Sequence, residues 1–377
     1  MIDIFLLLFG IVAVITELAF IFAWIIAWWR TRQKKIPQFF PKVCVIVPCK
    51  GVDKDFQSNV NAICTQDYED YTVIFVTDAK QDPAFKLLTK LYKDSSRIKV
   101  ITANYIQGSS GKISALIGGI HDASDVEVFV FADADIKPHK KWLSYLVSPL
   151  GDEHIGAATG YRWYFPENLQ YLIVSTWNML STSSLFFHFV NYAWGGSTAI
   201  TKNRFELLHI EQQWKRGFSD DLILTEAVKK AGYKIQGVPE SIIESNYDGD
   251  FRSFLRFGTR QYTWVRWYYS SSWVFSIIGF CGGKIITILG FILLLLGWTI
   301  PGALMTSTIA FEMINGWVAH RVLRNIMKYP KQKFGSSISY ALVTPVAFFI
   351  IAYNNLASAF KKEIKWGGRT YTRPAKK

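Results

Sequence analysis

The sequence predicts an α/β fold with a mostly parallel sheet, attached to one N-terminal and several C-terminal membrane helices. Apolar runs rich in β-branched residues at 42–48, 71–78, 98–101 and 126–132 have the composition of buried strands. The segment 81–91, between two of these runs, has the pattern of a helix. Strands that alternate with helices form parallel sheets, and the long apolar runs near both ends of the chain predict the membrane helices.

The composition favours a globular domain combined with membrane spans. Half of the 377 residues are hydrophobic and 16% are aromatic. The mean hydropathy is +0.15, which is high for a soluble protein and low for a bundle of membrane helices alone.

The first 29 residues are expected to form a retained membrane anchor (1–29). The run 4–29 is apolar apart from Glu17 and is long enough to cross about 30 Å of hydrocarbon. It has neither a basic start nor a small-residue cleavage site, so it does not resemble a removed signal peptide. The basic run 30–35 follows directly, and positive flanks stay cytoplasmic. The globular domain, expected over 40–270, would then face the cytosol.

The cysteine pattern agrees with a reducing compartment. The four cysteines show no C-x-x-C pair and no disulfide spacing, and they are Cys44, Cys49, Cys64 and Cys281.

The C-terminal membrane helices are expected within 271–360, and their number stays open. Three apolar stretches could each cross, namely 273–298, 299–318 and 336–360, with an interfacial basic segment near 320–334. An outside N-terminus and four spans would place the tail outside, whereas the basic tail 361–377 favours the cytosol. Either 273–318 crosses once, or one stretch is re-entrant or lies in the membrane plane.

The net charge of +13 does not indicate nucleic-acid binding, because no nucleic-acid motif accompanies it. The basic residues instead flank the apolar spans, where each would gain about 1 kcal/mol from anionic lipid headgroups. The same charges suit a sugar-nucleotide diphosphate.

Acidic residues follow two of the predicted strands. Asp133 and Asp135 come at the end of the run 126–132, and Asp78 ends the run 71–78. In parallel sheets ligands bind beyond the carboxyl ends of the strands, so these acids should meet in one crevice. Two carboxylates spaced i, i+2 suit Mg²⁺ or Mn²⁺ bridging a diphosphate, although a solvated acidic turn would have the same sequence.

The order of motifs resembles glycosyltransferase family 2 and its ceramide-glucosyltransferase relatives. The motifs are Val-Ile-Val-Pro at 45–48, Asp78, Gly111-Lys112, Asp133-Ala134-Asp135 and Ser219-Asp220-Asp221. The resemblance covers roughly 43–267 and resumes at 366–371. It implies a nucleotide-sugar-binding, glycosyltransferase-A-type (Rossmann-like) domain. It also implies transfer of a hexose, glucose first, from a UDP-sugar to a lipid hydroxyl such as that of ceramide.

The resemblance also implies roles for the donor-site residues. Asp78 would accept from the uracil imide, unless it is only the N-cap of the next helix. Asp135 would be the direct metal ligand, with Asp133 near the ribose or the metal. Lys112 at a helix N-terminus would add positive charge to the diphosphate site, the alternative being a surface lysine.

The general base is expected to be Asp221. Asp220 beside it would raise the pKa of the base, while plain N-terminal helix charge is the alternative. Gly195 and Gly196 would let the backbone approach the donor sugar, or simply form a tight turn. The apolar segment 171–192 is expected to be a helix, in the core or dipping into the bilayer.

The aromatic and basic motif of the family occurs in altered form, and its residues are expected to bind donor. Arg260 and Trp264 align with it, but Thr263 stands where an arginine belongs. Arg266, three residues further on, would share a helix face with Thr263 and could reach the same diphosphate. The alternative is that Arg266 snorkels to lipid headgroups beside aromatic residues 267–269.

Several functions are compatible with the sequence. A transporter would explain the spans, but no paired broken helices are present in the sequence pattern. A processive polysaccharide synthase needs many spans and the intact motif, which favours single transfer to a lipid. Diacylglycerol or a hopanoid would leave similar signals to ceramide.

Overall fold

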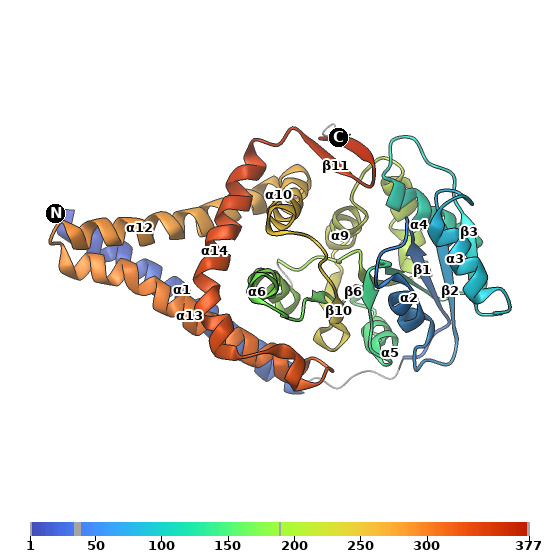
Figure 1. Ribbon diagram of the computed structural model, residues 1–377, viewed down its shortest axis with the longest axis horizontal. Helices are drawn as coiled ribbons and strands as arrows, with labels where there is room; N and C mark the ends of the chain where they lie inside the picture. The colour runs from blue at the N-terminus through green and yellow to red at the C-terminus, as the bar shows by residue number, and fades with distance from the viewer. Residues whose placement is uncertain (1, 34–38, 188–189, 375–377) are drawn as a thin grey trace.

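The computed structural model describes residues 2–33, 39–187 and 190–374. Its centre is a seven-stranded sheet with the strand order β3-β2-β1-β4-β8-β6-β9 (Figure 1). The strands are β1 (Val43–Pro48), β2 (Tyr71–Thr77), β3 (Ile98–Thr102), β4 (Val128–Ala132), β6 (Ile155–Thr159), β8 (Ser197–Thr201) and β9 (Lys234–Gly237).

The predicted mostly parallel α/β sheet is confirmed. Strands β3, β2, β1 and β4 are mutually parallel, and Val43 of β1 is in register with Tyr71 and with Val128. Strand β8 runs antiparallel between β4 and β6, and β9 is parallel to β6. Both faces of β1 and β4 are buried, which explains their almost unbroken apolar sequences.

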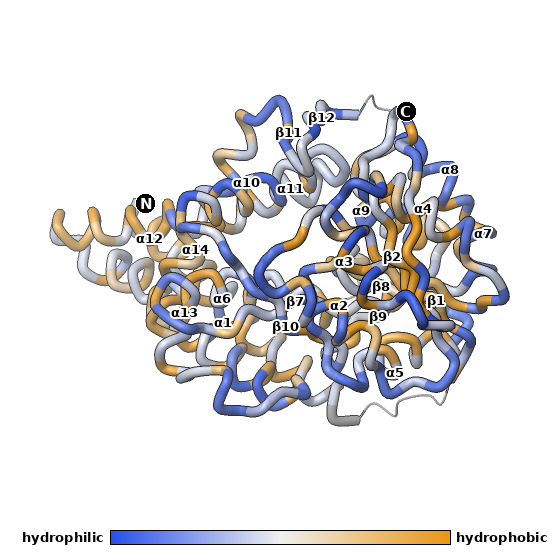
Figure 2. Tube along the Cα trace, turned by 45° about the vertical axis from the view of Figure 1, so that its right-hand side comes forward, coloured by the Kyte–Doolittle hydropathy of each residue, from blue (hydrophilic) through white to orange (hydrophobic). Residues whose placement is uncertain are grey.

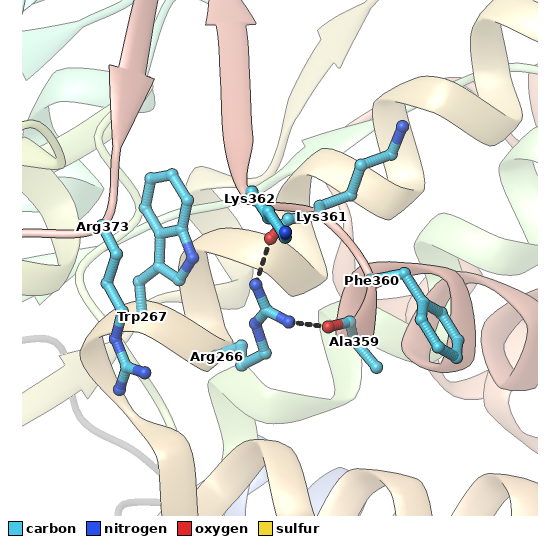
Figure 3. Close-up of a pocket in the computed structure, with 7 residues that line it drawn as sticks. All are labelled: Arg266, Trp267, Ala359, Phe360, Lys361, Lys362 and Arg373. Carbon is cyan, nitrogen blue, oxygen red and sulfur yellow. Dashed lines mark hydrogen bonds between the residues drawn. The ribbon is translucent and has the colours of Figure 1, made fainter.

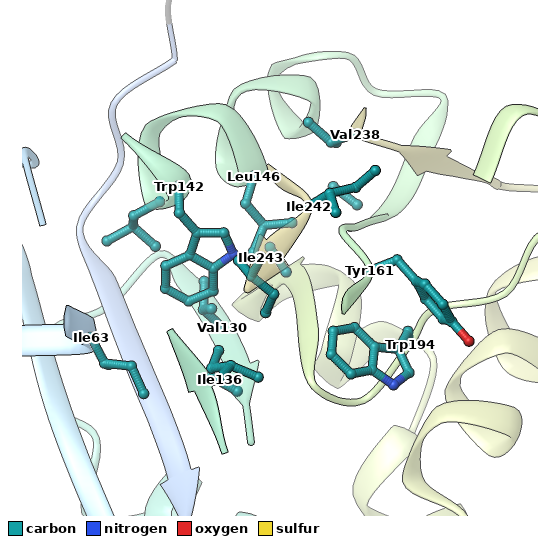
Figure 4. Close-up of a cluster of buried hydrophobic side chains, with 14 of the residues drawn as sticks. Ile63, Val130, Ile136, Trp142, Leu146, Tyr161, Trp194, Val238, Ile242 and Ile243 are labelled. Carbon is teal, nitrogen blue, oxygen red and sulfur yellow. The ribbon is translucent and has the colours of Figure 1, made fainter. Parts of the chain in front are cut away.

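Helices cover both faces of the sheet. On one face, α2 (Phe56–Cys64), α3 (Pro83–Tyr92) and α5 (Trp142–Val147) pack on alternate strand residues, and Figure 4 shows Trp142 and Leu146 beside Val130 there. On the other face lie α4 (Gly111–Asp122), α7 (Lys202–Leu207), α8 (Ile210–Trp214) and α9 (Asp220–Lys230). Burial on both faces fixes the sheet, so the loops at its carboxyl edge have a rigid base.

A small second sheet connects this domain to the membrane helices. It consists of β5 (Ile136–Lys137), β10 (Ile243–Ser245) and β7 (Arg162–Trp163). Helices α6 (Leu169–Thr182) and α10 (Phe251–Tyr268) follow β7 and β10. The expected single helix over 171–192 is shorter, because a 3₁₀ turn follows it over Ser183–Phe186, and positions 188 and 189 lie outside the described residues.

The remaining long helices form the predicted membrane part. They are α1 (Ile2–Gln33), α11 (Ser270–Ser276), a π-helical turn (Ile277–Cys281), α12 (Gly282–Leu295), α13 (Thr299–Ile326) and α14 (Ser337–Ala359). Within the described ranges, three segments are long and apolar enough to cross a membrane: Ile4–Trp29, Ser270–Leu295 and Lys331–Ala359. In Figure 1, α12 and α13 meet at a tip that also holds the N-terminus, and α14 runs across their far ends. Figure 2 shows hydrophobic residues concentrated in these helices and in the sheet strands.

Helix α13 extends into the basic segment 320–334, whose expected interfacial position stays a prediction. This helix continues past residue 318 to Ile326, and His320 is fully buried within it. The His320 ring stacks on Tyr340 with a centroid distance of 4.0 Å, and Nδ1 lies 2.8 Å from Ser337 Oγ. Leu323 and Ile326 join the core of the catalytic domain, so packing extends the helix beyond its basic residues.

The C-terminal tail folds back onto the catalytic domain. It forms a hairpin of β11 (Glu363–Trp366) and β12 (Arg369–Thr372), turned by two glycines with positive φ. Ile364 and Tyr371 pack with Leu222, Trp264 and Trp267. The tail therefore lies on the same side of the membrane helices as the catalytic domain.

Candidate active site

Four predicted elements meet around the amino group of Lys112. Its Nζ lies 2.7 Å from Asp133 Oδ1 and 3.2 Å from Asp220 Oδ2, and it donates to the Gly195 carbonyl at 3.2 Å. These groups come from the start of α4, the end of β4, the start of α9 and the turn before β8. Lys112, Asp133 and Asp220 therefore form one charged cluster at the carboxyl edge of the sheet.

Lys112 is a buried cation and not a surface lysine. Its side chain is 13% exposed and that of Asp220 is 7% exposed. Burial opposes the charge of Lys112, but Asp133 and Asp220 outweigh this effect and raise its pKa. Lys112 therefore stays protonated and neutralises part of the acidic cluster.

Asp220, the neighbour of the expected base, is a buried carboxylate with a raised pKa. Burial raises the pKa of Asp220 to about 6, with Lys112 acting in the opposite sense and Asp221 and Asp133 adding to the rise. Asp221 is half-buried, and its Oδ1 accepts from Ser219 Oγ and from the Leu222 backbone N–H at 2.7 Å. Its Oδ2 has no hydrogen-bond partner in the part of the chain that the structure describes, so one carboxylate oxygen is free to meet an acceptor hydroxyl.

Asp135 lies deep in the protein yet remains open to solvent. The Asp135 side chain is exposed to solvent. Desolvation by the surrounding protein, together with the charge of Asp133, raises the pKa of its carboxyl group to about 6, and Arg162 opposes the rise. No ion pair engages Asp135 among the described residues. A carboxylate at the base of an open crevice, beside a second carboxylate, fits a divalent cation that also needs phosphate or water ligands.

Neighbouring groups leave no room for a side chain at Gly195 or Gly196. A side chain at Gly195 would collide with Asp220 Oδ2 and lie 2.8 Å from Lys112 Nζ, and one at Gly196 would collide with the Trp194 ring. Their approach to a donor sugar stays a prediction, since the close contacts found here are within the protein.

Asp78 lies at the far side of the crevice, beside the tail. The N-cap of α3 is Asp82, whose side chain accepts from Ala84 N at 2.8 Å, so the capping alternative for Asp78 is excluded. Lys50 Nζ lies 3.3 Å from Asp78 Oδ2 and donates to the Gly367 carbonyl at 2.9 Å. Lys50 was not among the predicted site residues, although its position just after β1 places it at the carboxyl edge of the sheet.

The altered motif on α10 does not bring Arg266 to the carboxylates. Thr263 is fully buried and donates to the Thr259 carbonyl at 2.7 Å. The guanidinium of Arg266 donates to the carbonyls of Ala359 and Lys361 at the end of α14 (Figure 3). In this structure Arg266 does not take the place of the missing arginine, because the carbonyls at the end of α14 accept hydrogen bonds from its guanidinium. Its contact with the donor stays a prediction.

The surface around Arg266 is a basic and aromatic hollow of about 430 Å³. Its lining residues are Arg266, Trp267, Ala359, Phe360, Lys361, Lys362 and Arg373. Trp264 faces the other way, with its ring 5.3 Å from Trp267 and 6.0 Å from Tyr371. Trp264 thus joins α10 to the tail next to α9.

We expect Arg266→Ala to loosen the tail. Loss of the two bonds to Ala359 and Lys361 frees the segment that joins α14 to the hairpin. Trypsin should then cleave after Lys361 or Lys362 several times faster than in the wild type, measured by mass spectrometry. Arg256→Ala is the matched control, because Arg256 lies on the same helix and donates to Ser253 Oγ at 2.7 Å, away from the tail. A weakened affinity for UDP with unchanged cleavage would contradict this role.

We expect Lys112→Met to destabilise the protein by about 3–5 kcal/mol at pH 8, because it leaves the buried Asp220 and the partly exposed Asp133 without a cation. The folded-state pKa of Asp220 is already raised to about 6. Protonation of Asp220 therefore favours folding, and this contribution is lost as the pH rises through that value. The difference in unfolding temperature between variant and wild type should be clearly smaller at pH 5 than at pH 8. The exposed Lys230, paired with Glu226 at 2.6 Å, gives the control Lys230→Met. Equal differences at both pH values would refute the charge account.

This fold and this acidic cluster define a glycosyltransferase of the nucleotide-sugar-dependent A type. The family model described as Glycosyl transferase family 21 matches residues 10–375. The chain therefore belongs to glycosyltransferase family 21. The expected class is confirmed, although the order of motifs resembles family 2.

Solved structures of other glycosyltransferases match this chain at low identity. The mannosyltransferase PcManGT from Pyrobaculum calidifontis, in complex with GDP-Man and Mn²⁺, has 16% identity and a TM-score of 0.48, covering 94% of this chain and 97% of its own. GalNAc-T7 with UDP, GalNAc and Mn²⁺ has 14% identity and a TM-score of 0.43, covering 58% and 48%. Glucosyl-3-phosphoglycerate synthase from Mycobacterium tuberculosis, with Mn²⁺ and UDP, has 16% identity and a TM-score of 0.34, covering 55% and 70%. None of the curated proteins compared with this chain matches it. These similarities are too low to assign a donor or an acceptor.

Proposed function

We propose that this protein is a membrane-bound inverting glycosyltransferase that transfers a hexose, glucose first, from a UDP-sugar to a lipid hydroxyl such as that of ceramide. The observation that carries the proposal is the position of the acidic cluster between the sheet and the membrane helices. Helix α9, which holds Asp220 and Asp221, packs against α10, and α10 packs on α14. An acceptor anchored in a bilayer could therefore reach the carboxylates without leaving it.

Charged side chains would bind the metal, the diphosphate and the uracil in the donor half of the crevice. Asp135, with Asp133, would hold Mg²⁺ or Mn²⁺, which supplies charge neutralisation for the departing diphosphate. Lys112 adds a fixed positive charge beside Asp133. Asp78 would accept from the uracil imide, and Lys50 together with the tail turn would close that end of the crevice.

Asp221 would act as the general base. Its free Oδ2 could take the proton of the acceptor hydroxyl as that oxygen attacks the anomeric carbon. The described residues offer no second nucleophile on the donor side. A single in-line displacement inverts the anomeric centre and gives a β-glycoside from an α-linked UDP-sugar.

The arrangement of the helices suggests how the protein sits in the membrane. Helices α1, α12 and α13 pack along one another and would cross, although α13 is not one of the three apolar segments named above. The third of those segments, which contains α14, would lie in the plane of the cytosolic interface. One side of α14 is buried against α6, α10 and α13. The other side presents a row of exposed apolar residues, namely Ile338, Leu342, Val346, Phe349, Tyr353 and Leu356. Three crossings would put the N-terminus outside and the tail with the catalytic domain in the cytosol, in agreement with the basic tail.

The competing enzyme function is a processive polysaccharide synthase. Incubation of the purified protein with a radiolabelled UDP-sugar and membrane lipids separates the two functions. We expect the label in the chloroform-soluble fraction, as a lipid carrying one sugar. Label in a polymer that stays in the aqueous phase would overturn the proposed function. Diacylglycerol or a hopanoid as acceptor would be identified by mass spectrometry of the same extract.

A further inference from the structure

The hollow beside Arg266 collects four cations from three segments of the chain. Arg266 lies near the end of α10, Lys361 and Lys362 follow α14, and Arg373 follows β12. The last three side chains are exposed, and no carboxylate is among the residues that line the hollow. Like charges around a cavity of about 430 Å³ repel one another, so the hollow favours an anion.

The protein does not satisfy the guanidinium of Arg266 completely. Its terminal N–H groups donate to the carbonyls of Ala359 and Lys361, whereas its Nε is buried and has no hydrogen-bond partner within the described ranges. Burial, and then the charge of Arg373, lower the pKa of Arg266. A phosphate in the hollow would oppose both effects, because an opposite charge stabilises the protonated guanidinium.

The hollow lies where two apolar segments meet the aqueous side. Residues 266 and 267 come just before the candidate span Ser270–Leu295, and residues 359 and 360 come at the end of the segment Lys331–Ala359. Figure 3 shows the two ends beside each other, joined by the hydrogen bonds of Arg266. Aromatic and basic residues at the ends of apolar segments occupy the headgroup level of a bilayer. An anion in this hollow would therefore lie at the depth of the lipid phosphates.

A row of apolar side chains on α14 ends at the hollow. The exposed row described above finishes with Tyr353 and Leu356, and Phe360 follows four residues later with 78% of its surface exposed. Phe360 also lines the hollow. The acyl chains of a phospholipid would lie along this row while the phosphate occupies its basic end, so the shape and the charge select the same kind of ligand.

We propose that the hollow binds the phosphate of an anionic membrane phospholipid, which is a ligand and not the sugar acceptor, and that this lipid fastens the C-terminal hairpin. Inorganic phosphate offers the same oxygen atoms, but it would gain nothing from the apolar row. Lys362 precedes β11 and Arg373 follows β12, so one phosphate would hold both ends of the hairpin. The inference goes beyond the transfer reaction and rests only on the proposed membrane position of α14.

The test follows the hairpin in the full-length protein, held in uncharged maltoside micelles at constant ionic strength. The probes are dihexanoylphosphatidylglycerol, zwitterionic dihexanoylphosphatidylcholine and inorganic phosphate. Hydrogen exchange of the β11 and β12 amides, measured by mass spectrometry, reports binding at this place alone. We expect the phosphatidylglycerol to slow exchange several-fold with a saturable Kd, and the other two probes to need far higher concentrations. Lys362→Gln/Arg373→Gln should raise that Kd roughly thirtyfold, on the usual scale for two charges at headgroup depth.

The matched control removes two exposed lysines that do not line the hollow. Lys230 pairs with Glu226 at 2.6 Å and Lys365 pairs with Glu363 at 3.5 Å, so Lys230→Gln/Lys365→Gln lowers the net charge equally and should leave the Kd unchanged.

Three outcomes would overturn the inference. They are equal protection by phosphatidylcholine, equal protection by inorganic phosphate, which would make the hollow a free-anion site, and an unchanged Kd in Lys362→Gln/Arg373→Gln. None of these measurements involves a UDP-sugar. The absence of sugar transfer would therefore reject the proposed function and leave the lipid site standing.

Discussion

Replacement of Asp221 by asparagine is expected to lower kcat about a hundredfold or more while UDP-sugar binding persists. The variant keeps the size of the side chain and can still accept a hydrogen bond from the Leu222 N–H, which lies 2.7 Å from Oδ1. It loses the oxygen that would take the acceptor proton, so only the transition state is affected. Single-turnover transfer and calorimetric titration with UDP measure the two properties separately.

The matched control for this variant is Glu226→Gln on the same helix. Glu226 pairs with Lys230 in an exposed contact of 2.6 Å, so Glu226→Gln should change neither turnover nor UDP binding. Retention of more than about a tenth of wild-type turnover in Asp221→Asn would exclude Asp221 as the base, on the usual scale of general-base effects. A loss of UDP affinity equal to the loss of turnover would contradict the division of roles.

Removal of the divalent metal is expected to abolish transfer, and Asp135→Asn is expected to weaken UDP binding only when metal is present. Asp135 is solvent-accessible and without an ion-pair partner among the described residues, whereas Asp133 is already paired with Lys112 at 2.7 Å. Asp135 should therefore contribute more to metal affinity than Asp133. We expect the Kd of UDP with Mn²⁺ to rise at least about tenfold in Asp135→Asn, and the Kd measured in EDTA to be the same as for the wild type.

The control for the metal prediction is a carboxylate outside the crevice. Asp125→Asn removes an exposed carboxylate that pairs with Lys42, far from the crevice, and should leave binding unchanged. Full activity of the wild type in excess EDTA would reject a metal role. An α-linked product would reject the inverting displacement.

Local sequence determined which parts of the fold could be predicted. The strands β1, β2 and β4 are buried on both faces, and their continuous apolar runs identified them to within two residues. Because parallel strands end at one edge, the acids after β2 and β4 could be assigned to one crevice from the strand pattern alone. Lys112 and Asp220 meet at 3.2 Å for the same reason, since both open helices at that edge.

Contacts between distant segments account for what could not be predicted. The position of Arg266 depends on where α14 ends, 93 residues away in the chain. The pairing of Lys50 with Asp78 involves the tail, which returns to the domain only after all the membrane helices. The length of α13 depends on packing against the catalytic core rather than on its own hydropathy.

The central claim is single transfer of a hexose from a UDP-sugar to a membrane lipid, and one measurement tests it most directly. Membranes containing the wild-type protein are incubated with a panel of UDP-sugars and Mn²⁺, and the lipid extract is analysed by mass spectrometry. We expect a lipid whose mass has increased by one hexose residue, with UDP-glucose the best donor, and the absence of this product from membranes that contain Asp221→Asn. A hexose polymer in the aqueous phase, or no sugar-bearing lipid with any donor, would contradict the account.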